Sequence, residues 1–241
     1  MRVVIASYNT HGGVGLDRRF APHNIARVIG ELGADIVALQ ELHAPADGCD
    51  MLELLRDATG LFAIAGPTMT RNDGVFGNGL LTRFPVRSIE HVKLDVARRE
   101  PRGAIDAILD VHGTPLRVIA THLGLSPRER HEQIARLLDV ARLREHMPTV
   151  LLGDLNEWFV QRRALRWLHE HFGESPARAT FPSLLPILAL DRIWCVPASA
   201  MRNVRVHRSR LARVASDHLP LLAELDLDEA AVQHAIPAHA A

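Results

Sequence analysis

Side chains that bind metals or move protons follow apolar segments at several points along the chain. They are Asn9, Glu41, His122, Asp154, Asn156, Asp191, Asp217 and His218. A carboxylate at the rim of a buried strand must be paired, hydrated or bound to a metal. Several carboxylates that converge would repel one another unless a cation lay among them. Because oxygen ligands from Asp, Glu and Asn suit Mg²⁺ or Mn²⁺ better than zinc, we expect a hard divalent metal.

A strand, helix and strand pattern carries the first of these side chains. Residues 2–12 begin as an apolar, β-branched run and end in polar residues, which predicts a buried strand leading into a loop. Apolar residues recur at helical spacing over 25–32, and Gly33 then ends the predicted helix. A second apolar run, residues 35–41, ends in Glu41.

The same pattern occurs a second time. Residues 117–124 resemble the first strand and contain His122. The following helix has a clear start, with Ser126 as N-cap, Pro127 at the first helical position and a glutamate three residues after the cap. The next strand, 149–154, again ends in a carboxylate. Polar residues therefore occupy matching strand ends in the two copies.

The remaining segments extend this pattern to a larger α/β domain. Further predicted strands are 79–83, 104–111, 192–196, 203–207 and 219–227. Many strands with helices between and outside them predict two packed mixed β-sheets flanked by helices. We expect residues 1–228 to form a single catalytic domain and residues 229–241 to be a poorly ordered tail.

Five motifs occur in the order found in the endonuclease/exonuclease/phosphatase superfamily. They are Gln40-Glu41, Thr121-His122-Leu123, Gly153-Asp154-Leu155-Asn156, Leu190-Asp191-Arg192-Ile193 and Ser216-Asp217-His218-Leu219-Pro220. The chain resembles this superfamily, which includes DNase I-like nucleases, abasic-site endonucleases, sphingomyelinases and inositol-polyphosphate phosphatases, from Asn9 to Pro220. Five motifs in one order are far more specific than any one of them. The resemblance implies a DNase I-like α/β sandwich and metal-dependent hydrolysis of phosphoesters.

The resemblance also implies metal ligands and a source of the nucleophile. Glu41 would be the principal ligand of Mg²⁺ or Mn²⁺, with Asn9 and Asp217 as further ligands or water-mediated contacts. His218 would pair with Asp191, which fixes the tautomer of the imidazole and raises its basicity. The resemblance leaves open whether His218 or Asp154 deprotonates the attacking water.

Further roles concern the phosphoryl group. Asp154 and Asn156 would orient the water or hold the leaving oxygen. His122 would donate to a phosphoryl oxygen as negative charge develops. Arg102 matches a region where relatives place a phosphate-contacting group. No tyrosine stands at the phosphate-contact position that some nucleases of the superfamily use.

Simpler roles remain open for individual residues. Asn9 could be a turn residue at a strand end, and His122 could be a hydrogen-bonded core histidine. Asp154 and Asn156 could form an Asx turn. Asp191 could pair with its neighbour Arg192. However, Asp191 alternates with apolar residues along the predicted strand, which favours an inward side chain.

The amino-acid composition bears on which class of substrate the protein acts on. Lys plus Arg and Asp plus Glu are equal at 28 each, whereas a protein that binds DNA backbone usually carries a basic excess. One basic group does precede Asp217, at Arg202, Arg205, Arg208, Arg210 and Arg213, and it is a candidate substrate contact, although solvated loops explain most such charges. The two cysteines are too few for a disulfide framework. No segment has the length of a membrane span, and we expect a cytoplasmic protein.

These observations favour hydrolysis of a small or lipid-derived phosphoester by a phosphodiesterase or phosphatase. The segment 180–183 is also similar to bacterial members of the superfamily with no assigned substrate. A DNA endonuclease or exonuclease on the same scaffold is the alternative, but it would need a basic groove and stacking side chains. A catalytically inactive binding module is disfavoured because every expected acid and histidine is present.

Overall fold

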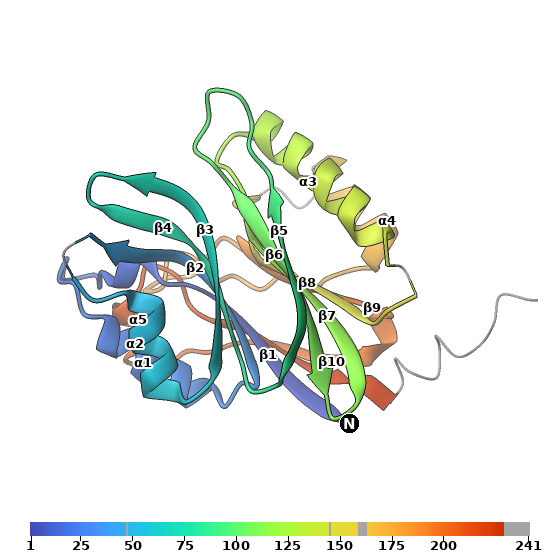
Figure 1. The fold of residues 1–241 in the computed structure, drawn as a ribbon, viewed down its shortest axis with the longest axis horizontal. Coiled ribbons are helices and arrows are strands. Elements are labelled where there is room, and N and C mark those ends of the chain that lie inside the picture. Colours follow the sequence, from blue (N-terminus) through green and yellow to red (C-terminus); the bar gives the residue numbers. More distant parts are fainter. Residues whose placement is uncertain (47, 145, 159–162, 229–241) are drawn as a thin grey trace, which may run out of the picture.

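Two β-sheets pack face to face in the computed structural model, and helices cover both outer faces (Figure 1). The structure describes residues 1–46, 48–144, 146–158 and 163–228. The predicted arrangement of two mixed sheets flanked by helices is confirmed. The predicted tail, 229–241, lies outside the described residues, so its order and the domain boundary stay predictions.

The first sheet has six strands in the order β10-β11-β1-β2-β4-β3. Its strands are β1 (Arg2–Asn9), β2 (Ile36–Pro45), β3 (Phe62–Arg71), β4 (Gly74–Thr82), β10 (Met201–Val206) and β11 (Leu221–Asp226). β1 pairs parallel with β2 and antiparallel with β11. The helices on its outer face are α1 (Pro22–Leu32), α2 (Met51–Thr59) and α5 (Ala212–Ala215).

The second sheet has five strands in the order β5-β6-β7-β8-β9. Its strands are β5 (Val86–Lys93), β6 (Gly103–Val111), β7 (Thr114–His122), β8 (Thr149–Asp154) and β9 (Asp191–Val196). The long helix α3 (Pro127–Arg142) and the helix α4 (Arg163–Phe172) cover its outer face (Figure 1). Short 3-10 helices, η1 (His11–Gly13) and η2 (Ala198–Ala200), follow β1 and β9.

Three apolar layers hold the sandwich together. The inner faces of the two sheets form one cluster that includes Ile5 and Ile193. A second cluster lies under α1, α2 and α5, and a third lies under α3 and α4 around Trp194. Alternate residues of one strand therefore enter different layers: on β9, Ile193 faces the other sheet and Trp194 faces the helices.

Local sequence signals place both predicted helices. Gly33 follows α1 with a φ of 60°, a left-handed conformation that glycine adopts without steric cost. Ser126 caps α3 and forms a reciprocal capping box with Glu129, as predicted. This cap fixes where the chain turns from the end of β7 into α3.

Four elements, β3, β5, α2 and α4, lack the sequence patterns that predicted the others. Most of the β5 side chains are exposed or half-buried, so the strand lacks a run of buried apolar residues. β3 alternates weakly and contains Pro67. β4 begins at Gly74, five residues before the predicted strand, because its first half forms a hairpin with β3.

One edge of the sandwich collects the polar strand ends. β1 and β2 run parallel, with Asn9 beside Gln40, and β7 and β8 run parallel, with His122 beside Asp154. Asp191 starts β9 opposite Asp154. Among the described helices, none combines the length and the apolar character needed to cross a membrane.

Candidate active site

Glu41 projects its carboxylate outward from an irregular point in β2. The pairing of β2 with β4 shifts between Leu39 and Leu42, and Glu41 has a φ of 56°. A β-bulge of this kind redirects a side chain out of the regular alternation. The Glu41 side chain keeps 40% of its exposure. Its carboxylate is therefore accessible to a ligand, in contrast to the buried carboxylates of Asp154 and Asp191.

Asn9 connects Glu41 to the second sheet. Its Nδ2 donates to Glu41 Oε1 at 2.8 Å and to Asp154 Oδ2 at 3.0 Å. Its Oδ1 accepts from the backbone N–H of His11, and its own backbone oxygen accepts from Ser216 Oγ. The side chain is thus more than a turn residue: it holds carboxylates from both sheets at one point.

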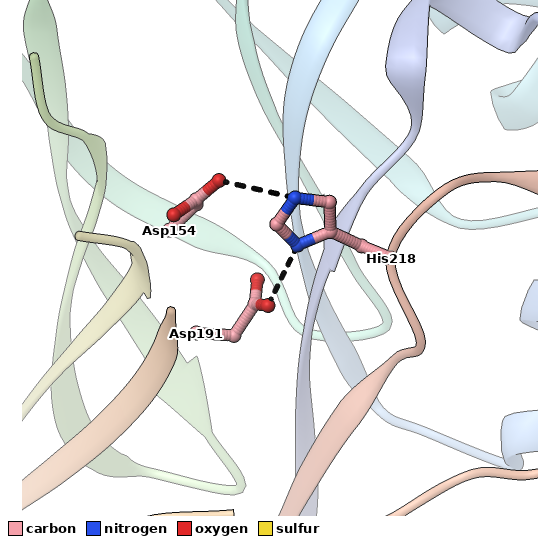
Figure 2. A group of neighbouring side chains, drawn as sticks. All are labelled: Asp154, Asp191 and His218. Atoms are coloured by element: carbon pink, nitrogen blue, oxygen red, sulfur yellow. Dashed lines mark hydrogen bonds and ion pairs between the residues drawn. The ribbon is translucent and has the colours of Figure 1, made fainter. Parts of the chain in front are cut away.

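Asp154, Asp191 and His218 form a buried group at the ends of three segments (Figure 2). His218 Nδ1 lies 2.9 Å from Asp191 Oδ2, and its Nε2 lies 3.6 Å from Asp154 Oδ2. The predicted pairing of Asp191 with His218 is present in the structure. Arg192, the simpler partner considered for Asp191, has no hydrogen-bond partner for its guanidinium nitrogens among the described residues.

Two residues that the sequence analysis did not assign support this group. Thr180 Oγ1 donates to Asp191 Oδ2 at 2.5 Å, and the ring of Phe181 lies 4.9 Å from the ring of His218. Both belong to a loop that reaches the site only through tertiary packing. The sequence signal for these contacts is a threonine eleven positions, and an aromatic residue ten positions, before Asp191.

His218 carries opposing electrostatic influences. Burial alone would lower the pKa of its imidazole, because the cation loses hydration. The carboxylate of Asp191, the hydrogen bond to it, and the charges of Asp154 and Asp217 outweigh burial and raise the pKa to about 10. The surrounding carboxylates therefore hold His218 as an imidazolium cation at neutral pH.

His122 has the opposite character. Burial, with Arg102 and His218 nearby, lowers its pKa to about 3 despite the carboxylate of Asp154. Arg102 Nη1 lies 3.0 Å from His122 Nδ1. Because a guanidinium can only donate, Nδ1 accepts and the single imidazole proton resides on Nε2. That Nε2 lies 3.7 Å from Asp154 Oδ2 and 3.9 Å from Glu41 Oε1.

The loop after β8 brings Asn156 to His122. Asp154 Oδ1 accepts from the backbone N–H of Asn156, so the predicted Asx turn is present. Asn156 has a φ of 52°, its Nδ2 lies 3.0 Å from His122 Nε2, and it donates to the backbone oxygen of Leu123. Gly153 permits the close approach of β8 to β7, since a Cβ there would collide with the backbone oxygen of Thr121. The turn and the site use the same residues.

Among the predicted metal ligands, Asp217 is the one with the weakest connection to Glu41. Its side chain is half-buried and accepts from Ser216 Oγ at 3.4 Å. Its backbone oxygen accepts from the N–H of Ser183. Among the described residues, no hydrogen bond or ion pair joins Asp217 to Glu41. Its role as a metal ligand stays a prediction.

The donor set fits a hard divalent cation. Glu41 and Asp154 direct oxygen atoms at one point, although Asn9 presents its amide nitrogen there and would have to turn its amide over to offer oxygen. Asp154, Asp191 and His218 offer ligand atoms within 4.8 Å of one another. Asp191 Oδ1 has no hydrogen-bond partner among the described residues. A buried carboxylate oxygen without a donor is unfavourable unless a cation or water satisfies it.

A cavity of about 330 Å³ opens beside this network. Glu41, His122 and Arg102 line it from the network, and Asn78 and Phe76 line it from β4. Asn78 donates to the backbone oxygen of Gly103. The cavity thus gives a ligand access to a carboxylate, an imidazole N–H and a guanidinium together.

Comparison with known sequences gives one family and a relative without an assigned activity. A model of the endonuclease/exonuclease/phosphatase family matches residues 6–218. The chain is also similar to the uncharacterized protein YbhP of Escherichia coli strain K12, with 30% identity over 92% of the chain and 96% of that protein.

Solved structures with the same fold include proteins of several functions. An endonuclease/exonuclease/phosphatase protein from Beutenbergia cavernae has a TM-score of 0.78 and 22% identity, over 93% of this chain and 71% of that one. The human nocturnin catalytic domain with bound sulfate has a TM-score of 0.70 and 18% identity, over 93% of each chain. A mannosyl-6-phosphatase from Bacteroides thetaiotaomicron has a TM-score of 0.72 and 16% identity, over 93% and 99%. At these identities the likeness establishes the fold alone.

Proposed function

Since the chain belongs to the endonuclease/exonuclease/phosphatase family, we propose that it is a Mg²⁺- or Mn²⁺-dependent hydrolase of a small or lipid-derived phosphoester. The observation that carries this proposal is the convergence of Glu41, Asp154 and His122 beside the cavity, which Glu41 and His122 line. Glu41 Oε1 and Asp154 Oδ2 both accept from Asn9 Nδ2, and both face His122 Nε2. Oxygen ligands and a hydrogen-bond donor thus surround one small space.

Glu41 would hold the metal, with Asn9 and Asp217 as additional or water-mediated ligands and Asp154 close to the same point. When bound, the cation would neutralise the negative charge that develops on the phosphoryl oxygens. The partial exposure of Glu41 supports this assignment. A metal ion held by a side chain at the wall of a cavity would keep coordination positions free for substrate and water.

Asp154 and His218 would activate the water. The water oxygen attacks phosphorus in line, its proton passes to the Asp154 carboxylate beside the His218 imidazolium, and the bond from phosphorus to the leaving oxygen breaks. Asp191 holds His218 through Nδ1 and leaves Nε2 facing Asp154. The leaving oxygen then takes up a proton from this pair or from solvent.

The phosphoryl group would bind against His122, Arg102 and Asn156. His122 is neutral with its proton on Nε2, so it can donate to a phosphoryl oxygen without changing its charge. Arg102 contributes a guanidinium at the cavity wall and holds the imidazole by donating to its Nδ1. Asn156 lies beside the ring and donates to the backbone oxygen of Leu123. Fixed donors aimed at developing negative charge lower a reaction barrier because they need no reorganisation.

A small or lipid-derived substrate is favoured over nucleic acid by the charge balance. The chain has 28 basic and 28 acidic residues and lacks the net basic charge that sequence-independent DNA contact favours. The cavity of about 330 Å³ lies within the range of small-ligand pockets.

The test is hydrolysis of bis-p-nitrophenyl phosphate, p-nitrophenyl phosphate and supercoiled plasmid, each with Mg²⁺, Mn²⁺ or EDTA. Glu41→Ala is the inactive variant, and Glu132→Ala, an exposed change on α3, is its matched control. We expect metal-dependent hydrolysis of the small diester or monoester that Glu41→Ala abolishes and Glu132→Ala leaves unchanged.

Other outcomes separate the alternatives. Plasmid nicking that Glu41→Ala abolishes would replace the small-phosphoester proposal with a nuclease. Hydrolysis in EDTA at the rate seen with Mg²⁺ would contradict the metal requirement. Hydrolysis that survives Glu41→Ala would place the chemistry elsewhere.

A further inference from the structure

Leucine and isoleucine side chains project into solvent beside the Asp191–His218 pair. Leu184, Leu185 and Ile187 expose 59%, 72% and 70% of their surface. They form the apolar loop, residues 183–187, between the site residue Thr180 and β9. Single exposed apolar residues are common, but a cluster of large ones beside a site marks an interaction surface.

Hydrogen bonds hold the base of the apolar loop in place. Thr180 N–H donates to the backbone oxygen of Leu188, and Ile187 N–H donates to the backbone oxygen of Phe181 at 2.9 Å. Ser183 N–H donates to the backbone oxygen of Asp217 at 2.7 Å. Because this base is fixed to the site, the apolar side chains at its tip are presented to solvent by an ordered support.

Arginines adjoin the apolar loop. Arg213 Nη1 donates to the backbone oxygen of Leu184, and Ser183 Oγ donates to the backbone oxygen of Arg213. Val214, which is 47% exposed, follows Arg213, and its backbone oxygen accepts from the N–H of Leu16. The apolar surface therefore continues from the loop across α5 to the segment after β1.

More basic side chains flank this surface. Arg208 and Arg210 are exposed in the connection from β10 to α5, at the same edge of the sandwich. Among the described residues, no carboxylate pairs with either. Arg18 and Arg19 are exposed shortly after Leu16, and Asp17, which precedes them, lies 3.9 Å from the guanidinium of Arg19. The surface thus combines projecting aliphatic groups with a surplus of guanidinium groups.

We propose that the apolar loop and its flanking arginines dock the protein on an anionic lipid surface. Aliphatic side chains insert at the boundary of headgroups and acyl chains, and arginines bind lipid phosphates. Docking would hold the active-site edge against the bilayer. Resting on the proposed function, the further consequence is that the substrate is an amphiphilic phosphoester whose head enters the cavity while its chains stay in the lipid.

Cosedimentation with vesicles tests the docking without turnover. Vesicles of phosphatidylcholine are compared with vesicles that also contain phosphatidylglycerol, at low and high salt in EDTA. The test variant combines Leu184→Ser, Leu185→Ser and Ile187→Ser. The matched control combines Phe62→Ser and Leu143→Ser, which remove exposed apolar groups from the opposite edge. A second variant combines Arg208→Gln and Arg210→Gln.

We expect binding to anionic vesicles that weakens with salt and falls about tenfold or more in the loop variant. The control variant should bind as the wild type does, and the arginine variant should lose the preference for phosphatidylglycerol. Glu41→Ala should still bind, which separates docking from hydrolysis. An unchanged melting temperature of the loop variant shows that it folds.

Contrary results overturn the proposal. Equal vesicle binding by the wild type and the loop variant would exclude this surface as the docking site. If the wild type binds neither kind of vesicle, lipid is excluded as the partner. If the wild type is instead a dimer that the loop variant converts to a monomer, a second copy of the chain covers the surface. Loss of hydrolysis by Glu41→Ala with normal vesicle binding would leave the docking intact.

Discussion

The two strand–helix–strand units of this chain have the same topology but present their terminal acids differently. β1, α1 and β2 carry Glu41 within β2, which continues to Pro45, whereas β7, α3 and β8 end in Asp154. In the first unit a bulge turns Glu41 toward the cavity and leaves it 40% exposed. In the second unit β8 stays regular to its end, and Asp154 is 1% exposed.

This difference separates two kinds of chemistry on one repeated unit. An accessible carboxylate can bind a cation that must also contact substrate, whereas a buried carboxylate can hold histidine and amide groups in fixed geometry. Asn9 joins the two by donating to both acids. The repeat therefore supplies the positions, and the local backbone at each strand end decides the role.

The largest effect should come from removing the charge of the exposed acid. Glu41→Gln keeps the shape of the side chain but weakens metal binding, so kcat/KM should fall by about 10³ or more. Because the side chain is partly exposed, the free energy of unfolding should change by less than about 0.5 kcal/mol. Enzyme assays and chemical denaturation of the same preparation measure both. A large loss of stability would contradict the separation of roles.

Changes at the buried acid should affect both activity and stability. Asp154→Ala leaves Asn9 Nδ2 and the Asn156 N–H without this acceptor, so we expect roughly 10²-fold lower activity and about 1–3 kcal/mol lower unfolding free energy. Asp154→Asn retains an acceptor oxygen and serves as the matched control. It should lose activity while recovering most of the stability in urea titrations. Equal destabilisation by both variants would show that charge, not hydrogen bonding, stabilises this strand end.

His122 and His218 should change the pH dependence of the unfolding free energy in opposite directions. His122 has a pKa of about 3, below its ordinary 6.5, so the unfolded chain binds the extra proton and stability rises with pH between 3 and 6.5. His218 has a pKa of about 10, so its contribution is complete below 6.5 and is lost as pH rises toward 10. Each slope is at most about 1.4 kcal/mol per pH unit for one proton.

Substitution separates the two profiles. His122→Gln should flatten the acidic limb of the unfolding free energy, and His218→Gln should flatten the alkaline limb. Urea denaturation across the pH range measures both limbs. If His218→Gln leaves the alkaline limb unchanged, its imidazole does not hold a proton in the folded protein at neutral pH.

Adding Mg²⁺ should raise the melting temperature by a modest amount, and this rise should depend on Glu41 of the first strand–helix–strand unit. Mg²⁺ bound only by the folded state at 100 times its Kd stabilises by about 2.7 kcal/mol, which for a domain of this size is a rise of a few degrees in Tm. Glu41→Gln should abolish the rise, and Glu132→Gln should retain it. Differential scanning calorimetry with and without EDTA gives the comparison. A full shift in Glu41→Gln would assign the ion to the buried group of Asp154, Asp191 and His218.

The smallest expected effect is a difference in thiol labelling between Cys49 and Cys195. Cys49 is exposed near the end of β2, whereas Cys195 is buried in β9, where burial raises its pKa to about 12. We expect one rapidly labelled thiol per folded chain, and Cys49→Ser should abolish that labelling without changing activity. Rapid labelling of Cys49→Ser would show that β9 opens readily.

The sequence could predict the elements whose signals are local. Apolar runs ending in acids gave the parallel pairs, and a capping box gave the start of α3. Exposed β5 and the hairpin strand β3 carry weak alternation, so tertiary pairing decides their structure. The contact of Asp191 with His218 agrees with the pairing that the family resemblance implied, although the catalytic roles stay predictions.

Loop contacts lie beyond such reasoning. Thr180 reaches Asp191 only because the loop before β9 folds back on the site. The contact of Arg102 with His122 was likewise not predictable, since it depends on how the connection from β5 to β6 folds over β7. The bulge at Glu41 also has no local signal in the sequence, because its φ of 56° is imposed by pairing with β4. Periodicity identifies strands, but these side-chain positions depend on neighbours far along the chain.

The position of β1 between β11 and β2 also orders the events of folding. β11 comes from residues near 221, and Ser216 just before it donates to the backbone oxygen of Asn9. A nascent chain can pair β1 with β2 early, but that sheet lacks a neighbour on its other side until almost the whole domain has been synthesised. Contacts of such long sequence separation form late and slow folding. Asn9 and Glu41 are synthesised early, and they join the polar residues around Ser216 only after the chain has reached β11.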